Sequence, residues 1–440
     1  MNNTSIPQAA AGNVSLAAHF HSPKPNVPLM WALGYVNRWL ILRDHFRVQK
    51  IDLPRRDLHR LYHAVNRGTA AFLAPNHPEF GFDWMLDKEI STYASPRMAS
   101  WAAHEIIGSA PWFWRRNNLI ANNGGEAATT YSIDWALKGH AVLAHPEGMV
   151  HWTADKIHPL FPGVADMATI AALESARRGQ PRPVYIVPVV WKLQYTDDIS
   201  GALHREMRLI ERSLGLPDGS GRRVADRFTD LQERILARQM VRFGFDASLV
   251  TGLDFFNRQN AFRAYLVATL QARYRVQLAE STERTIHRLA REIAARRREN
   301  PSDGTVRADA DRVREAERLG GFSRDVYSTP VLSQEQVGES LKRHRATLMR
   351  TGTLNVLHNY LPQPFGPRIA HVRVPEAIRI DEARASGSAD ERKAYVAELL
   401  HETRARMQAM LDSINAEIAA EVLALSYPNP LSAHGAARAA

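Results

Sequence analysis

The sequence lacks cysteine altogether in its 440 residues, which excludes disulfide bonds and thiolate metal sites. It also lacks a long apolar run, because the best candidate, residues 28–36, is followed at once by Asn37 and Arg38. A bilayer-spanning helix needs roughly 18–20 apolar residues. The N-terminal residues do not combine a basic start with an apolar core, as a signal peptide would. We therefore expect a cytoplasmic protein, peripheral to the inner face of a membrane rather than spanning it.

Several signatures of enzyme classes are missing as well. The sequence contains no Gly-x-Ser-x-Gly elbow, no P-loop and no Gly-x-Gly-x-x-Gly dinucleotide fingerprint. His104-Glu105 begins like a zinc-protease helix, but Gly108 stands where that motif has its second histidine. We therefore predict no metal site and no tightly bound cofactor.

Positive charge is in excess, with a formal net charge of +10. Such a balance favours an anionic partner, which can be a membrane surface, an acidic co-substrate or a nucleic acid. The basic runs Arg296-Arg297-Arg298 and Lys342-Arg343 raise the nucleic-acid alternative. Few aromatic residues are interleaved with these runs, so nucleic acid is the least favoured of the three partners.

Residues 46–200 alternate strand-like apolar runs with helical patterns, which is typical of a mostly parallel α/β sheet covered by helices on both faces. In such a sheet, ligands bind at the carboxyl ends of the strands. The predicted strands are 46–51, 70–74, 141–144 and 183–190, and the predicted helices are 57–66, 83–93, 125–138 and 164–178.

The flanking regions differ in character. A helix over residues 28–45 carries Trp31 and Trp39 between basic residues, a mixture that suits a lipid interface and also a core helix. Residues 361–425 return to the α/β pattern, with a strand and turn at 368–378 and a helix at 390–423. We expect disorder at 1–27 and 426–440, and a mainly helical region at 201–360 with helices 224–243, 259–298, 308–319 and 334–358.

Two short motifs follow predicted strands. His77 lies just beyond the run 70–74 and is followed by Asp83 at the start of a predicted helix, and Glu147 lies just beyond the run 141–144. An imidazole titrates near neutral pH and can act as a general base, and a carboxylate can orient it. Taken singly, a loop histidine and a helix N-cap would explain His77 and Asp83 equally well.

Together, these motifs resemble two blocks of the glycerolipid O-acyltransferases, the family of 1-acylglycerol-3-phosphate acyltransferase. The catalytic block resembles Asn76-His77-Pro78-Glu79-Phe80-Gly81-Phe82-Asp83, and the acceptor-binding block resembles Pro146-Glu147-Gly148. Weaker similarity extends over residues 104–114 and 160–168. The resemblance covers about residues 46–190 and 366–423 and leaves 201–360 unmatched.

The resemblance implies an acyltransferase-like α/β fold interrupted by a large helical insertion at 201–360. It also implies transfer of a fatty acyl group from acyl-CoA or acyl carrier protein, as co-substrate, to a hydroxyl of a lipid-like acceptor. His77 would be the general base and Asp83 its orienting partner. Substrate-binding positions would be Asn76, Asn123, Glu147, Gly148 and Lys156.

The sequence departs from the family pattern at three points. Five residues separate His77 from Asp83, where the family has four, and Asn123 stands where the family has a phosphate-binding arginine. Met149-Val150-His151 follows Gly148, where the family has Thr-Arg. Loss of two guanidinium groups argues against a simple phosphomonoester acceptor, unless Arg115, Arg116, His151 or Lys156 substitutes. The alternative function is an acyltransferase-like protein that binds lipid or membrane without turnover.

Overall fold

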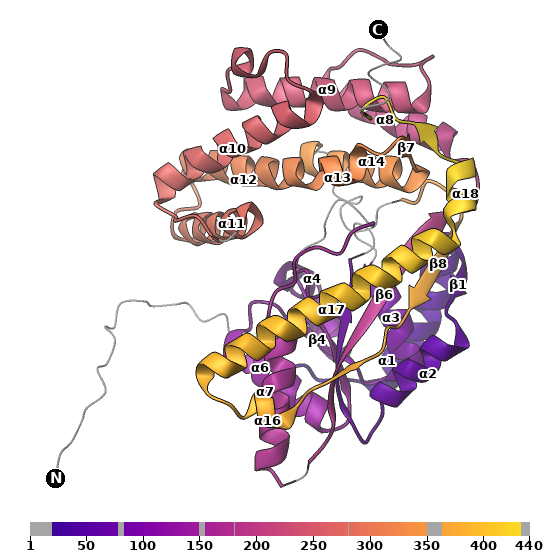
Figure 1. Cartoon of the computed structure of the whole chain (residues 1–440), viewed down its shortest axis with the longest axis vertical. Coiled ribbons are helices and arrows are strands. Elements are labelled where there is room, and N and C mark those ends of the chain that lie inside the picture. Colours follow the sequence, from indigo (N-terminus) through magenta and orange to yellow (C-terminus); the bar gives the residue numbers. More distant parts are fainter. Residues whose placement is uncertain are drawn as a thin grey trace, which may run out of the picture.

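The computed structural model describes residues 20–77, 83–148, 155–179, 181–279, 281–349 and 363–432. An eight-stranded sheet flanked by helices forms one part, and a layer of helices lies beyond one end of it (Figure 1). The strand order is β1-β8-β6-β2-β5-β3-β4, with β9 also paired to β6. Neighbouring strands run parallel, except that β8 and β9 run antiparallel to β6. The predicted mostly parallel α/β sheet is confirmed.

The strands lie where apolar side chains can be buried on both faces of the sheet. The central strand, β2, is buried along its whole length. The long strand β6 pairs in parallel with β2 through its first half and antiparallel with β8 through its second half. The strands are β1 (Val48–Asp52), β2 (Ala70–Pro75), β3 (Ala99–Ala102), β4 (Leu119–Ala121), β5 (Ala141–Leu143), β6 (Val184–Tyr195), β8 (Arg368–Arg373) and β9 (Ile378–Arg379).

The sequence did not indicate β3 and β4, which are three or four residues long and only partly buried. They form the edge of the sheet beyond β5. A strand this short gives too few residues for an alternating pattern to emerge from a single sequence. Because β3 and β4 follow β5 in the sheet, the turn after β4 lies further from β2 than a sheet of the predicted strands alone would place it.

Alternate residues of the strands face two separate cores, as the pleat requires. Ala70, Phe72 and Ala74 pack with α6, α7, α16 and the start of α17, whereas Ala71 and Leu73 pack with α2 and α3. The helices around the sheet are α1 (Val27–Val36), continued by a π-helical segment (Asn37–His45), α2 (Arg55–Ala64), α3 (Asp83–Ala94), α4 (His104–Ser109), α5 (Pro111–Arg116), α6 (Gly125–Leu137), α7 (Gly163–Arg177), α16 (Glu382–Ala385), α17 (Ala389–Glu417) and α18 (Ala419–Ala424).

The layer beyond the sheet, called here the helical region, comprises residues 200–349 and has its own apolar core, which Tyr195 at the carboxyl end of β6 joins. The predicted helix 259–298 is in fact two helices, because Arg275 adopts a left-handed conformation (φ 53°) between them. The elements are α8 (Ser200–Leu214), α9 (Val224–Phe243), a 3₁₀ turn (Ala247–Val250), α10 (Phe255–Tyr274), α11 (Thr282–Glu299), α12 (Gly304–Gly321), α13 (Arg324–Tyr327), β7 (Val331–Leu332) and α14 (Gln334–Leu348). Within the described residues, no helix is long and apolar enough to cross a bilayer.

Both terminal segments are more ordered than predicted where they are described. In the expected N-terminal arm, Phe20 packs on the sheet core and the Lys24 N–H donates to the Arg115 carbonyl at 2.9 Å. In the expected tail, β10 (Tyr427–Pro428) pairs antiparallel with β7, and Asn429 is buried. Backbone pairing and buried side chains hold these stretches in place. The remainder of the two predictions, 1–19 and 433–440, lies outside the described residues.

Candidate active site

His77 lies at the carboxyl end of β2, and Asn76 fixes the path of the chain there. The Asn76 side chain donates to the Trp191 carbonyl at 3.0 Å and accepts from the Trp191 N–H at 2.7 Å, so it bridges to β6. Asn76 is 2% exposed. Both ends of this amide are therefore held by the backbone of β6, and they anchor the turn that carries His77.

The predicted pairing of His77 with Asp83 is present. Nδ1 of His77 lies 2.7 Å from Oδ2 of Asp83, the first residue of α3, although the five residues between them lie outside the described part. A carboxylate on Nδ1 favours the tautomer that carries its proton there and leaves Nε2 with a free lone pair. No hydrogen bond to Nε2 is seen among the residues that the structure describes. The ring is thus arranged to accept a proton at Nε2.

The electrostatic surroundings keep His77 neutral. Burial, together with the positive charges of His145 and Arg343, holds the pKa of His77 well below the usual value for imidazole, and Asp87 opposes this only in part. A neutral imidazole is the form that can act as a base. Arg343 belongs to α14, so the helical region contributes to the field at this ring.

Glu147 joins the two predicted blocks physically. It follows β5, the parallel neighbour of β2, and its carboxylate accepts from the His77 N–H and from the His158 N–H, each at 3.0 Å. It is 2% exposed, and burial raises its pKa to about 7. Two backbone donors on two different loops therefore depend on one buried carboxyl group.

The sequence prediction missed a second histidine–carboxylate pair beside the first. The rings of His77 and His145 stack with centroids 3.8 Å apart and an interplanar angle of 16°. Nε2 of His145 lies 2.9 Å from Oδ2 of Asp87. Burial alone would lower the pKa of His145, but the charge of Asp87 and the hydrogen bond to it, with further help from Asp83 and Glu147, raise it to about 9. The signal was there, because Asp83 and Asp87 are four residues apart and therefore share a face of α3.

Gly148 is needed for its backbone conformation and its lack of a side chain. Its φ of +70° lies in the left-handed region, and a Cβ there would come within 2.6 Å of the Phe161 ring. The Gly148 N–H closes the turn by donating to the His145 carbonyl at 3.1 Å. This glycine shapes the loop that presents Glu147.

We expect Gly148→Ala to disturb both folding and the site. The left-handed conformation costs a non-glycine residue roughly 1–2 kcal/mol, and the contact with Phe161 adds to it, so the expected destabilisation is about 2–4 kcal/mol in total. Denaturant unfolding measures the loss. Gly179→Ala is the matched control, because Gly179 has a φ of +64° but open space around it, so only the conformational part of the loss should appear. Equal losses in the two variants would contradict the steric role of Phe161.

Of the other predicted binding residues, Asn123 lies apart from His77, and Lys156 has a partner in the helical region. Asn123 is exposed in the turn after β4. Strands β5 and β3 lie between β2 and β4, so at roughly 4.8 Å per strand β4 is about 14 Å from β2 across the sheet. Lys156 forms an ion pair with Asp325 of α13. Of the suggested substitutes, Arg115 binds the Ser22 carbonyl, Arg116 stacks on Trp112, and His151 lies outside the described residues.

The helical region contacts the loops of the site at several points. Phe161 contacts the His287 ring of α11 at 5.3 Å between centroids, and Gln336 of α14 donates to Asp155 at 3.2 Å. With Arg343, these contacts place α11, α13 and α14 beside the carboxyl end of the sheet. A pocket of about 750 Å³ lies between this region and α17–α18, with Lys192, Val326 and Val422 among its lining residues.

In the part of the chain that the structure describes, no group of three or more histidine, aspartate or glutamate side chains is arranged to hold a metal ion. Comparison with models of known protein families finds no match, and no curated protein matches the chain.

Proposed function

We propose that this protein is an O-acyltransferase that moves a fatty acyl group from a thioester donor, acyl-CoA or acyl carrier protein, to a hydroxyl of a lipid-like acceptor. The observation that carries the proposal is the His77–Asp83 pair at 2.7 Å, at the carboxyl end of a parallel sheet, in which Nε2 has no hydrogen bond among the described residues. The resemblance of the two sequence blocks to glycerolipid acyltransferases supports it, and Glu147 joins these blocks in space.

In the proposed reaction, Nε2 of His77 takes the proton of the acceptor hydroxyl while its oxygen attacks the thioester carbonyl. The tetrahedral oxyanion collapses, the carbon–sulfur bond breaks, and His77 returns the proton to the departing thiolate. The products are an ester and a free thiol. Asp83 holds the ring and stabilises the imidazolium, as the aspartate of a serine triad does, and the acceptor hydroxyl takes the place of the serine. N–H groups at the start of α3 would face the oxyanion.

The direct test is release of free thiol from acyl-CoA and from acyl carrier protein, in the presence of a panel of glycerol, lysophospholipid and polyol acceptors. Mass spectrometry of the organic phase identifies the ester that forms. Thiol release that depends on an acceptor, with the matching ester, supports the proposal. Binding of acyl donor without turnover on any acceptor would instead favour a lipid-binding protein that has lost the reaction.

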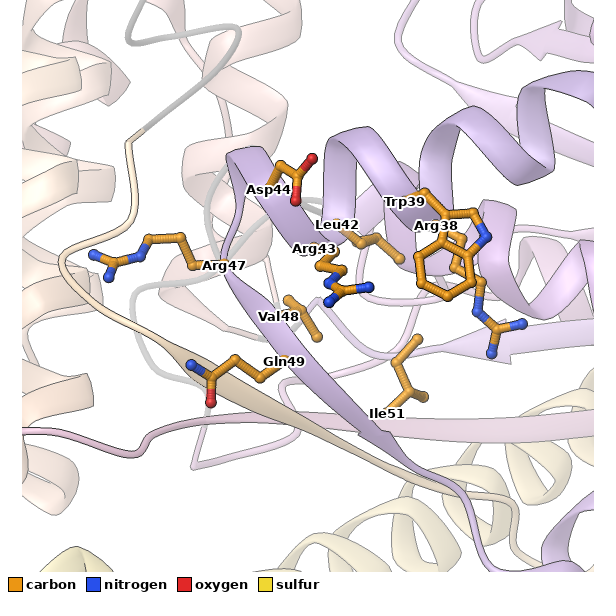
Figure 2. A pocket seen from close by; sticks show the side chains of 9 residues that line it. All are labelled: Arg38, Trp39, Leu42, Arg43, Asp44, Arg47, Val48, Gln49 and Ile51. Carbon is orange, nitrogen blue, oxygen red and sulfur yellow. The ribbon is translucent and has the colours of Figure 1, made fainter.

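We further propose that the protein meets its acceptor at an anionic membrane surface. One side of α1 and the π-helical segment presents a row of exposed apolar side chains, including Trp31 at 53% and Trp39 at 51% exposure. A pocket of about 820 Å³ lies beside them (Figure 2). In it, Arg47 lies at one end, Arg38 and Trp39 lie at the other, and Arg43 lies between them. Aromatic rings beside guanidinium groups suit the headgroup layer of an anionic bilayer.

Replacing Trp31 and Trp39 together by alanine is expected to lower the partition coefficient onto anionic vesicles by at least about tenfold. Withdrawing roughly 100 Å² of apolar surface from the interface costs about 2.5 kcal/mol per ring at ~25 cal/mol per Å², so even partial insertion of the two rings corresponds to more than a tenfold change. Co-sedimentation with phosphatidylglycerol vesicles measures the change. Val241→Ala, which alters an apolar side chain exposed at 79% on α9, is the control. Undiminished binding by the double variant would remove this surface from the proposal.

A further inference from the structure

Two histidine–carboxylate pairs share one helix. Asp83 and Asp87 lie one turn apart on α3 and reach His77 and His145, which end two adjacent parallel strands. The mechanism proposed above uses only the first pair. The second is equally well built, since the His145 and Asp87 side chains are 10% and 8% exposed and the two imidazole rings stack face to face.

Both nitrogens of His145 face hydrogen-bond acceptors. Nε2 lies 2.9 Å from the Asp87 carboxylate, and Nδ1 lies 3.2 Å from the Pro75 carbonyl, which can only accept. A neutral imidazole carries one proton and can donate to only one of them. Because a carboxylate is a much weaker base than an imidazole, the shared proton belongs on the ring. Only as an imidazolium, with a proton on each nitrogen, can His145 donate to both acceptors.

We propose that His145 is a positioning residue of the active site, a permanent cation that Asp87 holds in place. The positive charge of His145 keeps the stacked His77 unprotonated before the reaction, and it favours release of the proton that His77 takes up during the reaction. The catalytic use of this charge rests on the proposed acyl transfer, whereas the arrangement of His145, Asp87 and His77 does not depend on it. A second positive charge on His77 would stand about 4 Å from the first, so the imidazolium formed during attack is disfavoured. It passes its proton to the departing thiolate, and the base is regenerated.

Among the described residues, the charged groups that act on the stacked rings come from three places. They are Asp83 and Asp87 of α3, Glu147 after β5, and Arg343 of α14. The low pKa of His77 and the pKa of about 9 for His145 agree with the assigned charges. Removing the positive charge of His145 raises the pKa of His77. It also leaves the negative charge of Asp87 uncompensated, which raises the pKa of His77 further.

The expected result for His145→Gln is that the acidic limb of the kcat/KM profile moves upward by about one pH unit, which is about a tenfold loss of rate on that limb at fixed pH. Adding Asp87→Asn to this variant removes the uncompensated carboxylate, and it should return the acidic limb part of the way toward its wild-type pH. His140→Gln, at the opposite end of β5, is the matched control and should leave the limb in place. An unmoved limb in His145→Gln overturns the inference.

Nitrogen NMR of the full chain labelled with ¹⁵N-histidine tests the charge without any substrate. The signals of His77 and His145 are those lost in His77→Gln and His145→Gln. At pH 7.5 we expect imidazolium shifts for His145 and a neutral ring protonated on Nδ1 for His77. A neutral His145 overturns the inference whatever the activity. Conversely, the expected spectrum from a chain without acyl transfer upholds the charge pattern and rejects the proposed function alone.

Discussion

His77→Gln is expected to lower the turnover of acyl transfer by about 10²–10⁴-fold, the usual contribution of a positioned general base. Glutamine is close to histidine in size but does not titrate, so it cannot take the acceptor proton. The His77 N–H, which donates to Glu147, is a backbone group and survives the substitution. Folding should therefore change little, and the loss should appear in kcat rather than in the unfolding transition.

Asp83→Asn is the informative companion variant. An amide at that position can donate to Nδ1 and would favour the tautomer that carries its proton on Nε2, where the base must be free. We expect a loss comparable with that of His77→Gln, and the double variant should be little worse than either alone, because the two residues act as one unit. If the double variant instead showed the product of the two losses, the pair would not be working through a shared proton.

The second large effect is expected from Glu147→Ala, on stability. The buried carboxylate accepts the N–H groups of His77 and His158, and alanine removes this acceptor from both donors. Losing the acceptor of a buried donor costs about 1–3 kcal/mol, so the loss for the two donors should be about 2–6 kcal/mol in total, accompanied by loss of activity as the His77 loop moves. The midpoint of denaturant unfolding gives the measurement.

Two controls bracket this prediction. Glu147→Gln keeps one acceptor oxygen and should lose about half as much stability as Glu147→Ala. Glu126→Ala removes an exposed carboxylate from the first turn of α6 and should change the midpoint hardly at all. A Glu147→Ala variant that unfolds at the wild-type midpoint would show that the two loops do not depend on this side chain.

The sequence could predict the centre of the sheet and one pair of the site. β2, β5 and β6 are apolar runs buried on both faces, and such runs stand out without any knowledge of their neighbours. His77 and Glu147 follow the first two of these strands, so the rule for parallel sheets brought them together. Asp83 was predicted as the carboxylate one loop beyond His77, in a block that resembles the catalytic block of the glycerolipid acyltransferases.

The remaining features depend on contacts between distant residues, which a single sequence does not encode in any local pattern. The stacking of His145 on His77 requires β2 and β5 to be neighbours, and neither residue alone signals it. The distance of Asn123 from the site follows from β3 and β4, whose short strands gave no signal. Arg343 lies 266 residues beyond His77 in the sequence, and its charge acts on this ring through the packing of the helical region.

Chemical rescue tests the central claim most directly. His77→Gly leaves a cavity where the ring stood, and acyl transfer by this variant can be measured with increasing imidazole in the buffer. We predict very slow transfer without imidazole and a rate that rises with the concentration of its neutral form. Transfer at the wild-type rate without added imidazole would show that some other group removes the proton, and the proposed role of His77 would have to be abandoned.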